Sequence, residues 1–166
     1  MIKHLAAAAL LTLCQSVSHA DGFDISRFSN TNQLVWDASF REHVKTYFGS
    51  DRTLLFYEGS TVEQVLSGLG GPPDSIKLVA PNTYLATACR AQSCSEKVAY
   101  AANGEEEIFG VIGYSCNDQT NEFTYCPEGS ITLFYKNTSS KDVLANIILS
   151  WAKPKAPQAK IRMIKL

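Results

Sequence analysis

Two cysteines five positions apart, Cys89 and Cys94, constrain this chain more than any other feature. The runs on either side of them, residues 83–88 and 96–101, are rich in Thr, Tyr and Val, which fit a pleated surface. This pattern predicts a β-hairpin whose loop is closed at its base by a disulfide. The loop residues are Arg90, Ala91, Gln92 and Ser93. A rigid, polar, projecting loop of this kind is suited to insertion into a cleft of another protein.

The first twenty residues have the composition of a secretory signal peptide. Residues 5–13 are almost entirely Ala and Leu, a run too short to span a bilayer, and Ser18 and Ala20 provide the small residues that a signal peptidase requires. We therefore expect residues 1–20 to be removed on export to the periplasm, with secretion from the cell as an alternative. Cys14 leaves lipidation open, although the residue before it is not small.

The remaining residues, 21–166, are long enough for one domain with a real core. Loss of Lys3, the only charged residue of the signal, moves the formal net charge from −1 to −2. We find no basic patch that would indicate a nucleic-acid partner. No second apolar run reaches about 18 residues, so we expect no membrane contact after cleavage of the signal. The oligomeric state stays open, and a homodimer is one of the states that the sequence allows.

Four cysteines remain after cleavage, and an even number in an exported protein argues for two disulfides. They are Cys89, Cys94, Cys116 and Cys126. Of the three possible pairings we favour the two that are local in the sequence, 89 with 94 and 116 with 126. A metal site is the weaker alternative because the spacings are not those of zinc ligands and no histidine is near. We therefore expect neither a metal nor a cofactor.

Three stretches carry apolar residues at helical spacing. They run from about Leu34 or Asp37 to Phe48, from a capping box at Ser60 to Gly70, and from Ser139 or Ser140 to Pro154. The residues expected to be buried are Trp36, Phe40, Val44, Tyr47 and Phe48 in the first, Val62, Val65, Leu66 and Leu69 in the second, and Val143, Leu144, Ile147, Ile148 and Trp151 in the third. The pair Gly70 and Gly71 follows a helix, so we interpret it as a helix stop and not as a phosphate-binding loop.

Strand-like runs are found at residues 76–79, 83–88, 96–101, 108–114 and 131–135. Because tight turns such as Asn103-Gly104 join them, they predict an antiparallel meander. The whole order predicts an α+β domain in which an antiparallel sheet of about five strands is flanked by helices. Residues 54–57 form either a strand or an extended segment. The basic C-terminal tail is either a loose arm or a late edge strand, and its use as a binding site is left open.

Catalytic residues are hard to find in this sequence. Residues 21–166 contain one histidine, His43, on a predicted helix and without a nucleophile motif beside it, so a structural role is favoured. Glu105, Glu106 and Glu107 lie at a predicted turn, where we expect exposed carboxylates. The chain is therefore expected to be a binding protein and not an enzyme.

Residues 84–94, followed by Val98, Ala99 and Tyr100, resemble the signature region of the Ivy family, the inhibitors of vertebrate lysozyme. The secretory signal and the helix that includes residues 38–40 agree with this resemblance. It implies an exported bacterial protein with an antiparallel sheet flanked by helices. It also implies that the disulfide-closed loop enters the active-site cleft of a c-type lysozyme, so that the partner is a lysozyme-type glycoside hydrolase.

The loop departs from the family's sequence Cys-Lys-Pro-His-Asp-Cys. Arg90 keeps the positive charge of the lysine, and Ala91 replaces the proline. Gln92 replaces the histidine that reaches the two catalytic carboxylates, and Ser93 replaces the aspartate. Because a neutral amide donates weaker hydrogen bonds than a charged group, we expect an inhibitor weaker by about 1–3 kcal/mol, or about tenfold to hundredfold.

Three hypotheses about function follow. The chain inhibits a lysozyme-like muramidase through its hairpin loop. Alternatively, the same scaffold is an immunity or binding protein for another peptidoglycan hydrolase or toxin and does not inhibit lysozyme. The third hypothesis is an enzyme or small-molecule binder whose site the sequence does not reveal.

Overall fold

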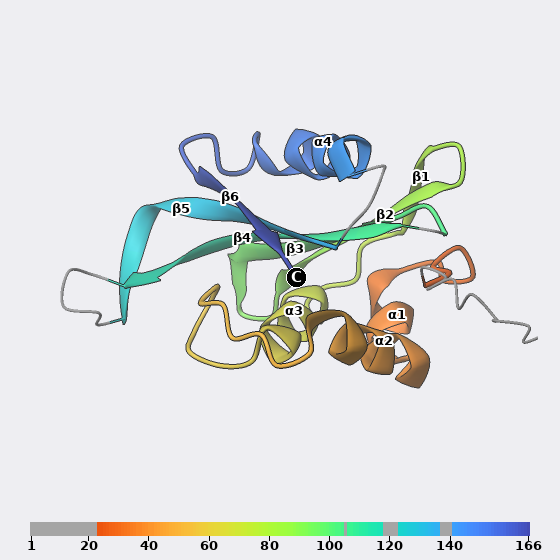
Figure 1. The fold of residues 1–166 in the computed structure, drawn as a ribbon, viewed down its shortest axis with the longest axis horizontal. Helices are drawn as coiled ribbons and strands as arrows, with labels where there is room; N and C mark the ends of the chain where they lie inside the picture. Colours follow the sequence, from red (N-terminus) through yellow and green to blue (C-terminus); the bar gives the residue numbers. More distant parts are fainter. Residues whose placement is uncertain (1–22, 105, 118–122, 137–140) are drawn as a thin grey trace, which may run out of the picture.

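The computed structural model describes residues 23–104, 106–117, 123–136 and 141–166. They form one six-stranded sheet with helices on both faces, which confirms the predicted α+β class (Figure 1). The strands lie in chain order as β1 (Lys77–Ala80), β2 (Thr83–Arg90), β3 (Ser93–Ala102), β4 (Glu107–Asn117), β5 (Phe123–Tyr135) and β6 (Lys160–Lys165). The predicted signal peptide lies outside the described residues.

The first five strands form the expected antiparallel meander, and the C-terminal tail adds a sixth strand at the edge. This last strand, β6, runs parallel to β5 because helix α4 (Lys141–Ala152) carries the chain back across one face of the sheet (Figure 1). The prediction of about five antiparallel strands therefore becomes a mixed sheet of six strands. Of the two states left open for the tail, the edge strand is the one observed.

Three helices cover the other face of the sheet: α1 (Thr31–Trp36), α2 (Ala38–Phe48) and α3 (Thr61–Leu69). The single helix expected before Phe48 is divided at Asp37, whose backbone is extended and whose carboxylate accepts a hydrogen bond from the Phe40 N–H at 2.9 Å. The break ends α1 at Trp36, which is 77% exposed, so its predicted burial is wrong. The burial predicted for Phe40, Val44, Tyr47, Phe48, Val62, Val65, Leu66 and Leu69 is confirmed.

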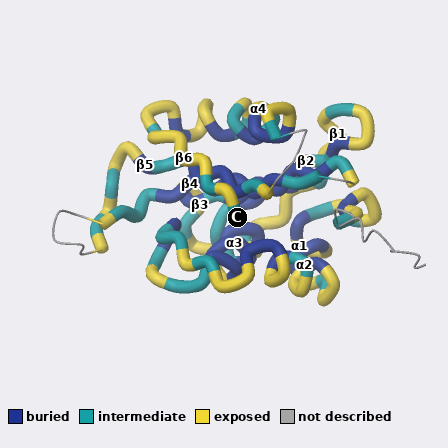
Figure 2. Tube along the Cα trace, in the orientation of Figure 1, coloured by how far each residue is buried: buried dark blue, intermediate teal, exposed yellow. Residues whose placement is uncertain are grey.

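The α4 face of the sheet has its own apolar core. Leu144 and Ile148 of α4 are buried there as predicted, among residues of β3, β4 and β5. Figure 2 shows buried residues along α4 and in the central strands. A Cβ atom on Gly110 of β4 would lie 2.3 Å from Ile148 Cγ2, so glycine at this position permits the close approach of α4. Val143 is 58% exposed, so the prediction that it is buried is wrong.

Residues 54–57 pair with no strand, and residues 55–57 are a series of bends, so the prediction of a strand or an extended segment is wrong here. A buried side chain supplies the hydrogen bonds of these residues. Gln64 of α3 accepts through Oε1 from the N–H groups of Leu55 at 3.0 Å and Phe56 at 2.9 Å. Its Nε2 donates to the Thr53 carbonyl oxygen at 3.0 Å. Gln64 is fully buried, so one side-chain amide satisfies backbone groups that no strand reaches.

Replacing Gln64 by Leu is expected to destabilise the protein by at least about 3 kcal/mol, because it leaves several buried backbone groups without hydrogen bonds. The measurement is the free energy of unfolding from urea denaturation. Glu63→Leu, at the exposed neighbouring position of the same helix, is the control and should change stability by less than about 1 kcal/mol. A cost below about 1 kcal/mol for Gln64→Leu would contradict the role of the amide.

Candidate functional site

The hairpin of β2 and β3 ends in a turn of two residues, Ala91 and Gln92, and both are exposed. Arg90 and Ser93 pair with each other as the last strand residues, so the loop is tighter than the four residues expected from the sequence. Gln92, the second residue of the turn, has a φ of 65°, a conformation that costs a non-glycine residue about 1–2 kcal/mol. The protein therefore presents Ala91 and Gln92 to solvent beyond the end of the strand ladder.

The predicted disulfide between Cys89 and Cys94 is present at the base of this turn, with its two Cα atoms 4.7 Å apart. The strand register changes at the same place. Cys89 pairs with Lys97, so residues 94–96 of β3 have no counterpart in β2. An insertion of this kind bends and twists a hairpin, and here the disulfide closes it. The tip of the hairpin is thus a small covalent ring and not a regular ladder.

The side chain of Arg90 is engaged within the protein. Its Nη1 atom lies 2.5 Å from Oε2 of Glu96, whose side chain is 12% exposed, so solvent screens this ion pair less than a surface pair. The guanidinium also lies over the rings of Phe56 and Tyr57, with its central carbon 5.7 Å and 5.5 Å from the ring centroids. Arg90, expected from the sequence in a partner-binding loop, here fastens the hairpin to residues 54–57.

The chain after α3 lies against the base of the same hairpin. A Cβ atom on Gly71 would lie 2.0 Å from the Cys89 carbonyl oxygen and 3.1 Å from the Ala91 nitrogen, so a larger residue does not fit. Gly70 is the C-cap of α3, in agreement with the interpretation of the glycine pair as a helix stop. The second role of Gly71, in packing, depends on a contact between segments that are distant in sequence.

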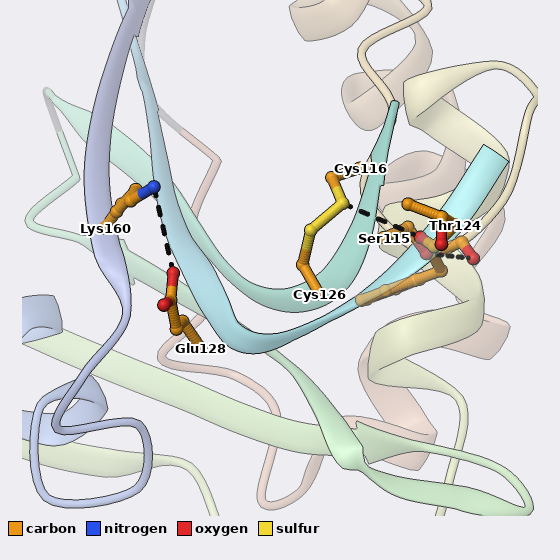
Figure 3. The surroundings of a disulfide bond; sticks show 7 residues. Ser115, Cys116, Thr124, Cys126, Glu128 and Lys160 are labelled. Carbon is orange, nitrogen blue, oxygen red and sulfur yellow. Dashed lines mark hydrogen bonds and ion pairs between the residues drawn. A yellow bond between two sulfur atoms is a disulfide. The ribbon is translucent and has the colours of Figure 1, made fainter. Parts of the chain in front are cut away.

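The second predicted disulfide, between Cys116 and Cys126, is also present (Figure 3). β4 continues to residue 117 and β5 begins at residue 123, so both strands reach beyond the predicted runs 108–114 and 131–135; residues 118–122 lie outside the described part. Ser115, beside the disulfide, donates a hydrogen bond to the Phe56 carbonyl oxygen at 2.7 Å. The part of the sheet that carries the Cys116–Cys126 disulfide, here called the disulfide arm, therefore also supports residues 54–57, against which the Arg90 side chain packs.

A cavity of about 330 Å³ lies between this arm and the edge strand β6. Its polar lining includes Ser115, Asn117, Glu128, Lys160 and Arg162. At this cavity, Lys160 Nζ of β6 lies 3.8 Å from Glu128 Oε2 of β5 (Figure 3). Both basic residues come from the C-terminal tail.

The one histidine of the described residues is part of a polar cluster that sequence analysis did not foresee. His43 Nε2 of α2 lies 2.6 Å from Glu107 Oε2, and the Tyr100 hydroxyl donates to the same oxygen at 2.5 Å. The Tyr47 hydroxyl donates to the Phe134 carbonyl oxygen at 3.0 Å. The Glu107 side chain is 12% exposed, so the expectation of a solvated carboxylate at this turn is wrong. The contacts tie α2 to the sheet and agree with a structural role for His43.

Three further features bear on alternative functions. Within the described ranges, no three His, Cys, Asp or Glu side chains are placed to hold a metal ion. No helix in those ranges combines the length and apolar character needed to cross a membrane. An apolar groove of about 620 Å³ lies between α4 and the β1–β2 edge, and its lining includes Val79, Leu85, Val143, Ile147 and Trp151.

Comparison of this chain with protein-family models, with curated proteins and with solved structures finds no match. The resemblance to the Ivy family therefore rests on the residues of the hairpin region and stays a prediction. What this chain binds is inferred from the geometry of the hairpin together with that resemblance.

Burial raises the pKa of the Tyr47 hydroxyl far above its ordinary value of 10.0, and burial together with the Glu107 carboxylate raises the pKa of Tyr100 well above the same value. Below pH 10 both tyrosines are neutral in the folded and in the unfolded chain, so their ionisation does not reduce the free energy of unfolding there. Above pH 10 the unfolded chain releases protons that the native state keeps, so stability falls as pH rises.

We therefore expect the free energy of unfolding to fall above pH 10 by up to about 1.4 kcal/mol per pH unit for each of these tyrosines. Tyr100→Phe should remove about half of this slope, as measured by urea denaturation between pH 9 and pH 11. Val44→Ala, a core variant without a titratable group, should lower stability at every pH and leave the slope as it is. An unchanged slope in Tyr100→Phe would contradict this origin of the alkaline instability.

Proposed function

We propose that this protein inhibits a lysozyme-like muramidase by inserting the Cys89–Cys94 hairpin into the active-site cleft of the enzyme. The observation that carries the proposal is the covalently closed tip, from which only Ala91 and Gln92 extend beyond the strand ladder. A loop that is ordered before binding loses little conformational entropy when it enters a cleft. The resemblance to the Ivy family supports a lysozyme as the target.

The supports around the tip also favour insertion. The hairpin is held by its disulfide, by the Arg90–Glu96 ion pair and by the close contact of Gly71 with the Cys89 carbonyl. The disulfide and the ion pair fix the shape of the tip, and the Gly71 contact fixes its position against the end of α3. A tip fixed in this way would keep its shape when it displaces water from a cleft.

Each of the four tip residues has a distinct role in this proposal. Gln92 is exposed and offers two N–H donors to the pair of carboxylates that muramidases use in catalysis. Ala91 keeps the turn narrow, and Ser93 adds a hydroxyl at the rim. Arg90 acts as a positioning residue through Glu96 and the two aromatic rings, because its charge is already paired.

The second candidate function is an immunity or binding protein for another peptidoglycan hydrolase or toxin. The observation in its favour is electrostatic. Arg90 is paired with Glu96, and Gln92 is neutral, so the exposed turn residues offer no positive charge to a cleft that contains two carboxylates. In this second candidate function the hairpin has the same shape but binds a cleft that is less negatively charged than the active site of a lysozyme.

The two disulfides agree with a protein that folds in an oxidising compartment outside the cytoplasm. For the proposed inhibitor we place that compartment in the periplasm, after cleavage of residues 1–20. Peptidoglycan hydrolases act on the cell wall, so the inhibitor and its target would meet there.

Gln92→Gly is expected to weaken inhibition of a c-type lysozyme by about tenfold to hundredfold, because glycine accepts the positive φ and removes only the amide. Gln92→His should strengthen inhibition, since a protonated imidazole donates charge-assisted hydrogen bonds to carboxylates. The measurement is the inhibition constant in a cell-wall lysis assay with the purified chain after removal of the signal.

Asn82→Gly provides the matched control, because Asn82 is the other non-glycine residue of the described part with a positive φ and lies in the exposed β1–β2 turn. It should leave inhibition unchanged. Equal inhibition by the original chain, Gln92→Gly and Gln92→His would remove Gln92 from the mechanism. Absence of lysozyme inhibition, combined with tight binding to a different peptidoglycan hydrolase, would favour the second candidate.

A further inference from the structure

The outer edge of β6 is free in the described part of the chain. β6 is the last strand of the sheet, and no described strand pairs with its far side. The Leu166 N–H donates to the Tyr135 carbonyl oxygen at 2.9 Å, which fixes the alternation of backbone groups along the strand. The amides of Arg162 and Ile164 accordingly point to β5. Those of Ile161, Met163 and Lys165 point away from the sheet, where a further strand could pair with them.

Over residues 160–163 the side chains of β6 form two rows of different chemistry, and the next two residues, Ile164 and Lys165, reverse this order. Lys160 and Arg162 lie on one face of the sheet, where they line the cavity beside the Cys116–Cys126 arm. Ile161 and Met163 lie on the opposite face and are 46% and 42% exposed. An added strand would therefore meet basic groups on one face and apolar groups on the other.

We propose that the β6 edge binds an extended acidic segment of a partner protein by strand addition. Acidic side chains of the segment would lie beside Lys160 and Arg162, and the residues between them, which are apolar, would cover Ile161 and Met163. Backbone hydrogen bonds to the outward amides supply affinity, and the alternation of acidic and apolar residues supplies specificity.

The charge of the edge selects this occupant over a second copy of the chain. Among the described residues, Arg162 and Lys165 form no ion pair with a carboxylate, and Lys160 reaches only Glu128, at 3.8 Å. Pairing of β6 with another β6 would bring the basic residues of two copies close together, and β6 contains no acidic side chain to offset them. An acidic strand neutralises the same residues.

This surface is separate from the hairpin of the proposed inhibitor. Two strands, β4 and β5, lie between β3 and β6 in the sheet, and the tip residues Ala91 and Gln92 belong to the β2–β3 turn. Both surfaces can therefore be occupied at once, and each can be tested without the other.

The test measures fluorescence anisotropy of labelled seven-residue peptides titrated with the full chain after removal of the signal. The first peptide is Gly-Glu-Val-Glu-Val-Glu-Gly, the second has the same composition without alternation, and the third has Lys in place of each Glu. The variants are Arg162→Glu, which reverses one charge, and Met163→Pro, which removes one outward N–H and leaves the bonds to β5 in place. Lys77→Glu, an exposed lysine on the opposite edge strand β1, is the control.

We expect the alternating acidic peptide to bind, and to bind more weakly as salt concentration rises. Arg162→Glu and Met163→Pro should each weaken this binding by at least about tenfold, while Lys77→Glu leaves it unchanged. The proposal is overturned if all three peptides bind alike or none binds, or if Arg162→Glu binds as the original chain does. It is also overturned if sedimentation shows self-association that Met163→Pro abolishes, since a second copy would then occupy the edge.

Discussion

The buried amide of Gln64 fixes the segment on which the candidate site depends. It satisfies the backbone of Leu55 and Phe56, which have no strand partner, and so allows a non-repetitive segment to be buried between α3 and the sheet. Phe56 lies in turn under the guanidinium of Arg90, whose ion pair with Glu96 holds the hairpin. Gln64 of α3 thereby helps to position the turn of Ala91 and Gln92, which is distant in sequence. The shape of the hairpin tip follows from the packing of the core.

The hairpin tip and the β6 edge serve different purposes in this account. The β2–β3 hairpin is rigid and exposes two neutral residues, whereas the β6 edge exposes backbone amides between basic and apolar rows. A narrow rigid tip suits entry into a preformed cleft, and a free strand edge suits an extended segment without structure of its own. The six-stranded sheet separates the two surfaces and keeps each in a fixed place.

The features that could be predicted from the sequence are those that depend on neighbours along the chain. The Cys89–Cys94 hairpin, both disulfides and the helix of Val62 and Leu69 follow from local spacing and turn residues. Trp36 was expected in the core because its spacing is helical, but capping by Asp37 ends the helix and turns the indole to solvent. The paired state of Glu107, the burial of Gln64 and the packing role of Gly71 arise from contacts between distant segments, for which spacing gives no signal.

The claim that the closed hairpin enters the cleft of a muramidase is tested most directly by inhibition of a c-type lysozyme with one disulfide removed at a time. The double variant Cys89→Ser, Cys94→Ser opens the tip, and Cys116→Ser, Cys126→Ser removes the other bridge, each at a cost of about 2–3 kcal/mol in stability. The account predicts that the folded first variant loses inhibition and the folded second variant keeps it. Equal inhibition by both variants, or no inhibition by the chain with both disulfides intact, would contradict the account.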